Sequence, residues 1–126
     1  MTKCLYRIVL LLVLTLASSV TLYAGEDRYA AIAFSPSTGR YGYGNKATTK
    51  SAAIERALKE CGEHDAITKW CKNQWIALAV TPRTRTGYGW GTGARLTAGE
   101  ARSVAVDMCL KYNEEAKVLV CVSASR

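Results

Sequence analysis

Residues 29–36, YAAIAFSP, return 46 positions later as residues 75–82, WIALAVTP, and this repeat decides the fold. Further blocks follow both copies in the same order: Tyr41-Gly-Tyr-Gly44 with Tyr88-Gly-Trp-Gly91, Cys61 with Cys109, and Cys71 with Cys121. We therefore interpret the chain as two similar units, residues 28–72 and 74–123. Two such units are too few for a solenoid, so we expect them to share one core.

Each unit has the pattern of strand, strand, helix and strand. The repeated segments are rich in Ala, Ile, Val and aromatic residues and end at a proline turn, which is typical of strands. We expect first strands at 28–35 and 74–81, second strands at 41–44 and 88–91, and third strands at 67–72 and 117–123. Thr49 and Thr97 are suited to cap the helices, because apolar residues follow each at helical spacing. The prediction is an α+β fold of two pseudo-symmetric units.

The first 24 residues have the features of a secretory signal peptide. Lys3 and Arg7 precede an apolar run, and the charged residues 26–28 follow Ala24. We expect cleavage after Ala24, which leaves residues 25–126 as one domain in the periplasm or outside the cell, with no stable membrane span. The alternative is an uncleaved membrane anchor, because the stretch is nearly long enough to cross a bilayer.

Four cysteines follow the expected cut, and an even number in an exported chain predicts two disulfides that staple the fold. Cys61 and Cys109 close the helices, and Cys71 and Cys121 lie on the third strands. Pairing within each unit, Cys61 with Cys71 and Cys109 with Cys121, would add roughly 2–3 kcal/mol by closing short loops. The alternative exchanges partners, so that Cys61 joins Cys121 and Cys71 joins Cys109.

The ordered set of motifs resembles a known bacterial family. Paired aromatic-x-Ala-(Ile/Leu)-Ala strands, aromatic residues interleaved with glycine, and alanine-rich helices ending in cysteine are similar to the domain of unknown function 4189 over residues 28–123. This resemblance implies a small secreted or periplasmic protein. It implies no agreed activity and no catalytic residues.

The sequence favours a protein that is not an enzyme. His64 is the only imidazole, and it lies among the acidic residues Glu63 and Asp65 in a polar loop. A hydrolase that pairs His64 with Cys61 or Cys71 would need a free thiol, whereas an oxidising compartment favours disulfides. Three consecutive side chains also do not converge on one metal ion without help from elsewhere. We therefore expect no catalytic residues, no metal and no cofactor.

The aromatic-glycine strands are the most distinctive feature. Alternation places Tyr41 and Tyr43 on one face and the intervening glycines on the other, and Tyr88 and Trp90 follow the same pattern. The rings are suited to stack on sugars or a peptide. The alternative, which we prefer, is that the rings cover the core and the bare glycine backbone lets a helix or the other unit approach closely.

Charge is concentrated in the second unit. Residues 72–126 carry eight basic and four acidic groups, while residues 25–71 carry seven and six. Arg83 and Arg85 lie at a hairpin tip and Arg95 in a later loop, where they are suited to bind an anionic partner unless they are merely solvated. Removal of residues 1–24 lowers the net charge from +7 to +5, which is modest for a nucleic-acid-binding protein.

These features favour a non-catalytic binding protein. The expected partner is another protein in the envelope or outside the cell, as for an inhibitor, an immunity protein or a secreted effector. The candidate binding residues are Arg83, Arg85, Arg95, Tyr41, Tyr43, Tyr88 and Trp90. The alternative is a cell-wall or glycan-binding module that uses the aromatic strands. We expect no nucleic-acid partner.

Overall fold

The computed structural model describes residues 26–110 and 115–125, over which the order strand, strand, helix, strand occurs twice. The first unit consists of β1 (Tyr29–Phe34), β2 (Tyr41–Ala47), α2 (Lys50–Cys61) and β3 (Ile67–Lys72). The second consists of β4 (Trp75–Val80), β5 (Trp90–Arg95), α3 (Ala98–Leu110) and β6 (Lys117–Ser123). The predicted α+β class is confirmed, and both third strands have the predicted bounds.

The expected signal peptide, residues 1–24 with a cut after Ala24, lies outside the described residues. Within the described part of the chain, neither helix is long and apolar enough to cross a membrane.

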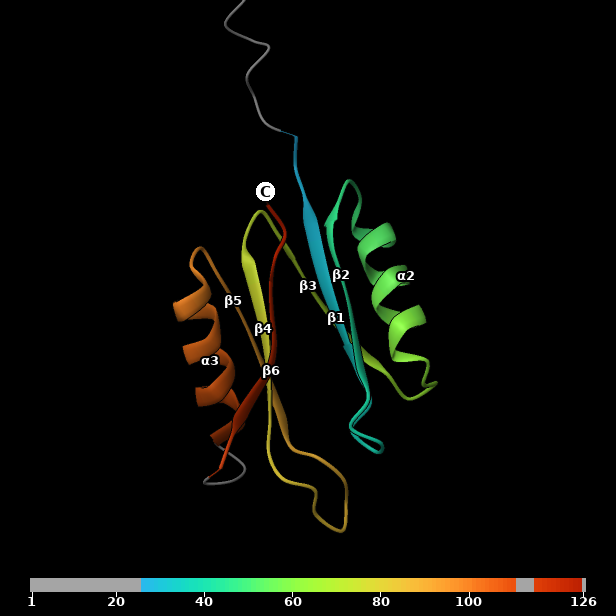
Figure 1. The fold of residues 1–126 in the computed structure, drawn as a ribbon, viewed down its shortest axis with the longest axis vertical. Coiled ribbons are helices and arrows are strands. Elements are labelled where there is room, and N and C mark those ends of the chain that lie inside the picture. Colours follow the sequence, from blue (N-terminus) through green and yellow to red (C-terminus); the bar gives the residue numbers. More distant parts are fainter. Residues whose placement is uncertain (1–25, 111–114, 126) are drawn as a thin grey trace, which may run out of the picture.

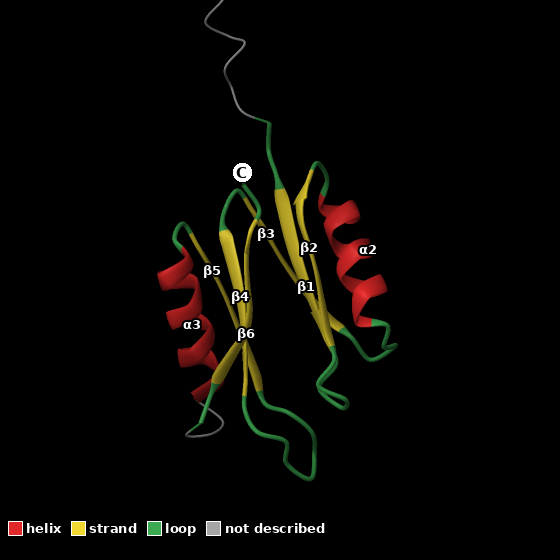
Figure 2. Ribbon diagram, in the orientation of Figure 1, coloured by secondary structure: helices red, strands yellow, loops and turns green. Residues whose placement is uncertain are grey.

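Each unit forms one antiparallel three-stranded sheet, with strand order β2-β1-β3 in the first unit and β5-β4-β6 in the second. The segment that repeats in the sequence is therefore the central strand of each sheet. The two sheets face each other and the helices cover their outer faces. Figures 1 and 2 show the resulting four layers, in the order α3, sheet, sheet, α2.

Side chains on the central strands alternate between the two faces of each sheet, with the large ones on the inner face and alanines on the outer face. Between the sheets, Ile32 and Phe34 of β1 share one buried cluster with Ile76 and Leu78 of β4. On the outer faces, the alanines of β1 and β4 meet helix residues in two smaller clusters: Ala31 and Ala33 with Ala53, Ala57 and Cys61, and Ala77 and Ala79 with Ala101, Ala105 and Cys109. Large residues fill the shared core, and small ones let each helix lie close to its sheet.

Glycines of the second strands allow the closest approach of helix and sheet. A Cβ added at Gly42 would lie 2.5 Å from the backbone nitrogen of Cys61 in α2. The second unit repeats this arrangement, because a Cβ at Gly91 would lie 2.5 Å from the carbonyl oxygen of Ala105 in α3. The glycines therefore serve helix packing.

The predicted helix caps form, and a glycine closes the first turn. Gly39 adopts a φ of +78°, and its N–H donates to the Ser35 carbonyl oxygen over 2.8 Å, which closes the β1–β2 turn. Thr49 Oγ1 accepts from the Ala52 N–H at 3.1 Å, and Thr97 Oγ1 accepts from the Glu100 N–H at 3.3 Å. Both helix starts are thereby capped.

The second strand of the second unit begins two residues later than predicted. Gly91 and Gly93 face α3 as Gly42 and Gly44 face α2, so Trp90, and not Tyr88, corresponds to Tyr41. Residues 81–89 join β4 to β5, whereas only residues 35–40 join β1 to β2. The chain from Tyr88 to Gly93 alternates with three glycines, and the pattern alone does not indicate which two face the helix.

The predicted disulfide staple is not supported, since Cys61, Cys71, Cys109 and Cys121 are all free. In the first unit, Cys61 packs on the face of the sheet that α2 covers, while Cys71 lies in the cluster between the sheets. In the second unit, Cys121 approaches the Ala98 carbonyl oxygen at the start of α3, while Cys109 lies near its end. Ala98 and Cys109 are eleven residues apart along α3, which corresponds to roughly 16 Å.

The exchanged pairing fails for a related reason. Cys61 and Cys121 lie on the outer faces of different sheets, so both sheets stand between them. Cys71 lies between the sheets, whereas Cys109 belongs to α3 and packs on the outer face of the other sheet. None of these pairs can come within the ~7 Å Cα separation that a disulfide requires without large backbone movement.

Candidate binding surface

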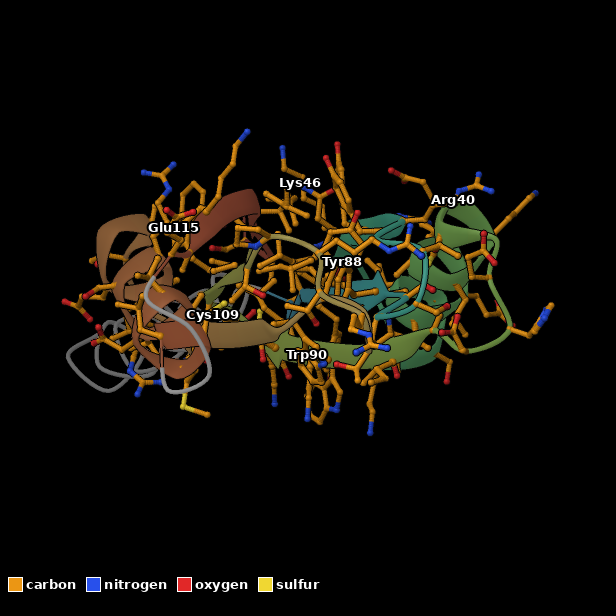
Figure 3. The ribbon with its side chains drawn as sticks, turned by 90° about the horizontal axis from the view of Figure 1, so that it is seen from below. Arg40, Lys46, Tyr88, Trp90, Cys109 and Glu115 are labelled. Atoms are coloured by element: carbon orange, nitrogen blue, oxygen red, sulfur yellow. The ribbon has the colours of Figure 1, made fainter. Side chains whose placement is uncertain are left out.

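The sandwich has two open edges, and the predicted aromatic residues are divided between them. Strand β2 lies beside β6 along one edge, the β2/β6 edge, and β3 lies beside β5 along the other, the β3/β5 edge. Figure 3 shows Lys46 of β2 and Trp90 of β5 on opposite sides of the molecule, with Tyr88 between them. The four rings therefore do not form one continuous row.

Tyr41 and Tyr43 lie on the β2/β6 edge. They pair with Phe34 and Ile32 of β1, so their side chains leave the sheet on the face toward the other unit. Each remains 37% exposed because β2 is an edge strand. The two rings therefore form a small exposed aromatic surface of their own.

Tyr88 joins the two hairpin loops. Its ring meets Phe34 edge to face with centroids 6.4 Å apart, and its N–H donates to the Pro36 carbonyl oxygen at 2.9 Å. A Cβ at Gly39 would lie 2.8 Å from the same ring. These contacts assign Tyr88 a packing role between the units.

Trp90 borders a cavity on the β3/β5 edge. Its ring centroid lies 6.4 Å from that of Phe34 and 5.9 Å from the Lys69 ammonium. A cavity of about 350 Å³ opens here, and its lining residues are Lys69, Tyr88, Gly89, Trp90, Gly91, Thr92 and Met108. We call this space the Trp90 groove.

Sequence reasoning named Trp90 but missed Lys69 and Met108. Lys69 pairs with Ile32 of β1, so it lies on the same face as the shared core and reaches Trp90 across the gap between the sheets. Met108 comes from the last turn of α3 and stays 43% exposed. Alternation along β3 was the available signal for Lys69, because it places Ile67, Lys69 and Cys71 on one face.

The structure separates the three candidate arginines. Arg83 and Arg85 are exposed in the loop that leads into Trp90. Arg95 is at the far end of β5, roughly 16 Å from Trp90 at the usual strand rise, and its Nη1 donates to the Ala94 carbonyl oxygen at 2.6 Å. Only Arg83 and Arg85 lie at the same end of β5 as the Trp90 groove.

The outer face of β3 carries a second exposed aromatic cluster that the sequence did not single out. Trp70 is 44% exposed, and its ring lies 6.2 Å from that of Tyr29. Lys50, at the start of α2, places its ammonium 4.3 Å from the Trp70 ring centroid, within cation–π distance.

The acidic loop is tied to the first hairpin. Asp65 accepts hydrogen bonds from the hydroxyls of Ser35 and Ser37, each at 2.6 Å. These two bonds lower the pKa of the Asp65 carboxyl from its ordinary value of 3.8. The carboxylate is thus engaged in holding the β1–β2 turn against the loop before β3, while His64 beside it is exposed.

The cysteines lie in apolar surroundings. Burial raises the pKa of the Cys71 thiol and of the Cys109 thiol, which lowers the fraction present as reactive thiolate. Within residues 26–110 and 115–125, no three His, Cys, Asp or Glu side chains come together to hold a metal ion.

Comparison with known protein families identifies a match. The family model of a domain of unknown function, DUF4189, matches residues 29–123, which covers both sheets and both helices. No curated protein and no solved structure matches the chain.

Proposed function

Starting from a chain that belongs to the DUF4189 family of domains of unknown function, we propose that this protein is a non-catalytic binding protein whose partner is another protein. Its place of action is the periplasm or the medium, on the strength of the N-terminal sequence. An inhibitor, an immunity protein or a secreted effector works in this way. The Trp90 groove is the binding site.

The observation that carries the proposal is the composition of the Trp90 groove. An indole ring, a thioether and an ammonium group border one cavity of about 350 Å³. Trp and Met are enriched where proteins bind proteins, because a large apolar surface gives affinity, and a single ammonium group beside that surface adds orientation. The groove is built on β3 and β5, which the central strands hold in place, so little ordering is needed on binding.

Charge around the groove favours an acidic partner. Arg83 and Arg85 are exposed on the loop that enters β5, and Lys69 faces the groove itself. Basic groups at the rim of an interface accelerate association with a negatively charged surface. We therefore expect the bound face of the partner to combine apolar side chains with carboxylates.

Affinity capture with the full chain as bait tests the proposal on envelope and culture fractions of its own host. The matched set comprises the wild type, Trp90→Ser and Lys69→Glu in the groove, and Tyr41→Ser on the opposite edge. We expect one protein in stoichiometric amount with wild type and Tyr41→Ser, and its loss with both groove variants. Lys69 is exposed, so Lys69→Glu should stay folded and still test the groove if Trp90→Ser unfolds. Equal recovery of all proteins by all four baits would overturn the proposal.

A glycan partner is the second candidate, and the exposed pair Tyr41 and Tyr43 on the β2/β6 edge favours it. Rings on one strand face are suited to stack on successive sugars. Sedimentation with purified peptidoglycan discriminates the two functions. If the wild type sediments with peptidoglycan and the Tyr41→Ser/Tyr43→Ser variant stays in the supernatant, the protein binds the cell wall.

A further inference from the structure

We propose that β3 is the docking edge for an extended acidic segment of the partner protein, which adds as a fourth strand to the sheet β2-β1-β3. This inference rests on the proposed function and specifies how the partner occupies the Trp90 groove. Strand addition supplies affinity through backbone hydrogen bonds, and pockets for alternate side chains supply selectivity.

The four edge strands differ in how well they are protected against pairing. The ladder between β1 and β2 is interrupted by a bulge, at which Lys46 adopts a φ of +53°, and the ladder between β4 and β6 is interrupted between Leu78 and Ala79. Bulges twist an edge strand away from further pairing. The ladders of β3 and β5 run without interruption. The two regular edges thus lie together along the β3/β5 edge.

Of these two, β3 is the more open. Helix α3 packs on β5 and buries Gly91 and Gly93 beneath it, whereas α2 packs mainly on β1 and β2. The outer face of β3 consequently leaves Trp70 exposed, and its inner face leaves Ile67 38% exposed. An added strand therefore meets exposed apolar side chains on both faces of β3.

The Trp90 groove lies where the side chains of an added strand would point. Lys69 on the inner face of β3 lines the groove together with Trp90 and Thr92 of β5. A strand placed beside β3 extends its sheet along the β3/β5 edge, where the groove opens. Its inward side chains then enter the groove, and its outward side chains lie along Trp70.

Charge selects the occupant. Strand β3 carries Lys69 and Lys72 and has no acidic residue. Among the residues that the structure describes, Lys72 pairs with Asp27 at 3.1 Å, and no carboxylate pairs with Lys69. Pairing of β3 with a second copy of itself would bring four lysines onto one short ribbon, which like-charge repulsion disfavours. A segment that alternates carboxylates with apolar side chains offsets the charge and fills the groove.

The first test uses two synthetic peptides, one that alternates Glu with Leu and a matched one that alternates Lys with Leu. Fluorescence anisotropy measures the binding of each peptide to the full chain. We expect the acidic peptide to bind and the basic peptide not to. Lys69→Glu should weaken acidic peptide binding roughly tenfold, and Lys46→Glu, the same charge change on the protected β2 edge, less than about twofold. Absence of acidic peptide binding, or equal losses in both variants, overturns the proposal.

The second test asks whether the bound peptide forms a strand. Two versions of the acidic peptide are N-methylated at alternate amides, each blocking one of its two edges. Strand addition predicts that one version loses binding and the other keeps it, and that alternate amides of β3 gain protection from hydrogen exchange. Loss with both or with neither, or protection confined to β5, overturns docking at β3.

Failure of this inference is distinguishable from failure of the proposed function. A stoichiometric partner that requires Lys69 and leaves the β3 amides unprotected supports the binding function and overturns strand addition. Protection of β3 by the acidic peptide, with no protein recovered in capture, supports the docking edge and overturns the proposed function.

Discussion

The N–H of Tyr88 donates to the carbonyl oxygen of Pro36 at 2.9 Å and so joins the two hairpin loops end to end. The Tyr88 ring lies over Gly39, where an added Cβ would be 2.8 Å away. The two units are therefore connected at this end of the sandwich by backbone pairing and by a ring that fits only against glycine.

Gly39→Ala should destabilise the fold by about 2–3 kcal/mol, because it adds steric overlap with Tyr88 to the cost of a positive φ. Gly62→Ala is the matched control, since Gly62 has a φ of +69° and its added Cβ has nothing nearer than Arg40 Nη2 at 3.9 Å. The control should cost about 1 kcal/mol. Urea unfolding measures both variants, and equal losses would show that the ring contact contributes nothing.

Gly42→Ala should destabilise by roughly 2–4 kcal/mol, because the new methyl group meets the backbone of α2, which cannot rotate away as a side chain can. Gly99→Ala is the control in α3, where an added Cβ meets nothing within 4 Å. Alanine there should be neutral or stabilising, since it favours a helix. Thermal unfolding of the two variants decides the point, and similar melting temperatures would contradict close helix packing at Gly42.

Local patterns predicted most of the fold. The strand-like composition of residues 29–36 and 75–82, the threonine caps and the proline turn each act within a few residues, so the sequence contains them. The second strand at Tyr88 was misplaced because three glycines alternate there, and only the position of α3 selects Gly91 and Gly93. The loop before β5 is longer than the loop before β2, so the two second strands do not begin at equivalent positions of the repeat, and no local motif indicates this.

The cysteines were misassigned for a reason that concerns register. Cys71 pairs with Ala30, on the face between the sheets, whereas Cys121 pairs with Ala77, on the face under α3. Two cysteines that align in the sequence thus point to opposite layers, because a shift of one residue exchanges the faces of a strand. The Trp90 groove was predicted only in part for a different reason, because Lys69 and Met108 reach it from β3 and α3, which are distant from Trp90 in sequence.

Stability should fall as the pH drops below about 4 because of Asp65. Hydrogen bonds from Ser35 and Ser37 lower the pKa of this carboxyl below 3.8 in the folded state. The stabilisation is therefore present above the unfolded pKa and is lost as the pH falls through the folded pKa. Asp65→Asn should reduce this decrease in the free energy of unfolding at acid pH, as measured by urea titrations at several pH values. Asp107→Asn, which replaces an exposed carboxylate of α3, is the control, and the same reduction in both variants would count against the role of Asp65.

The cysteines should titrate as free thiols. The denatured, unreduced protein should give four reactive groups from Cys61, Cys71, Cys109 and Cys121, and Cys4 adds a fifth where the first residues are retained. In the native protein the reaction should be slow at Cys71 and Cys109, because burial raises their pKa. Ellman titration with and without guanidinium measures both states. A denatured protein that shows no free thiols would mean that the cysteines pair after a rearrangement of the layers.

Reversal of charge at Arg83 and Arg85 should weaken partner binding mainly by slowing association. The Arg83→Glu/Arg85→Glu variant changes the exposed loop beside the Trp90 groove, and rim charges act chiefly on the association rate. We expect a decrease in this rate of roughly tenfold at low salt that shrinks as ionic strength rises. Arg95→Glu at the far end of β5 is the control and should have a much smaller effect. Surface plasmon resonance with the captured partner measures the rates, and an unchanged association rate in the double variant would exclude this loop from the interface.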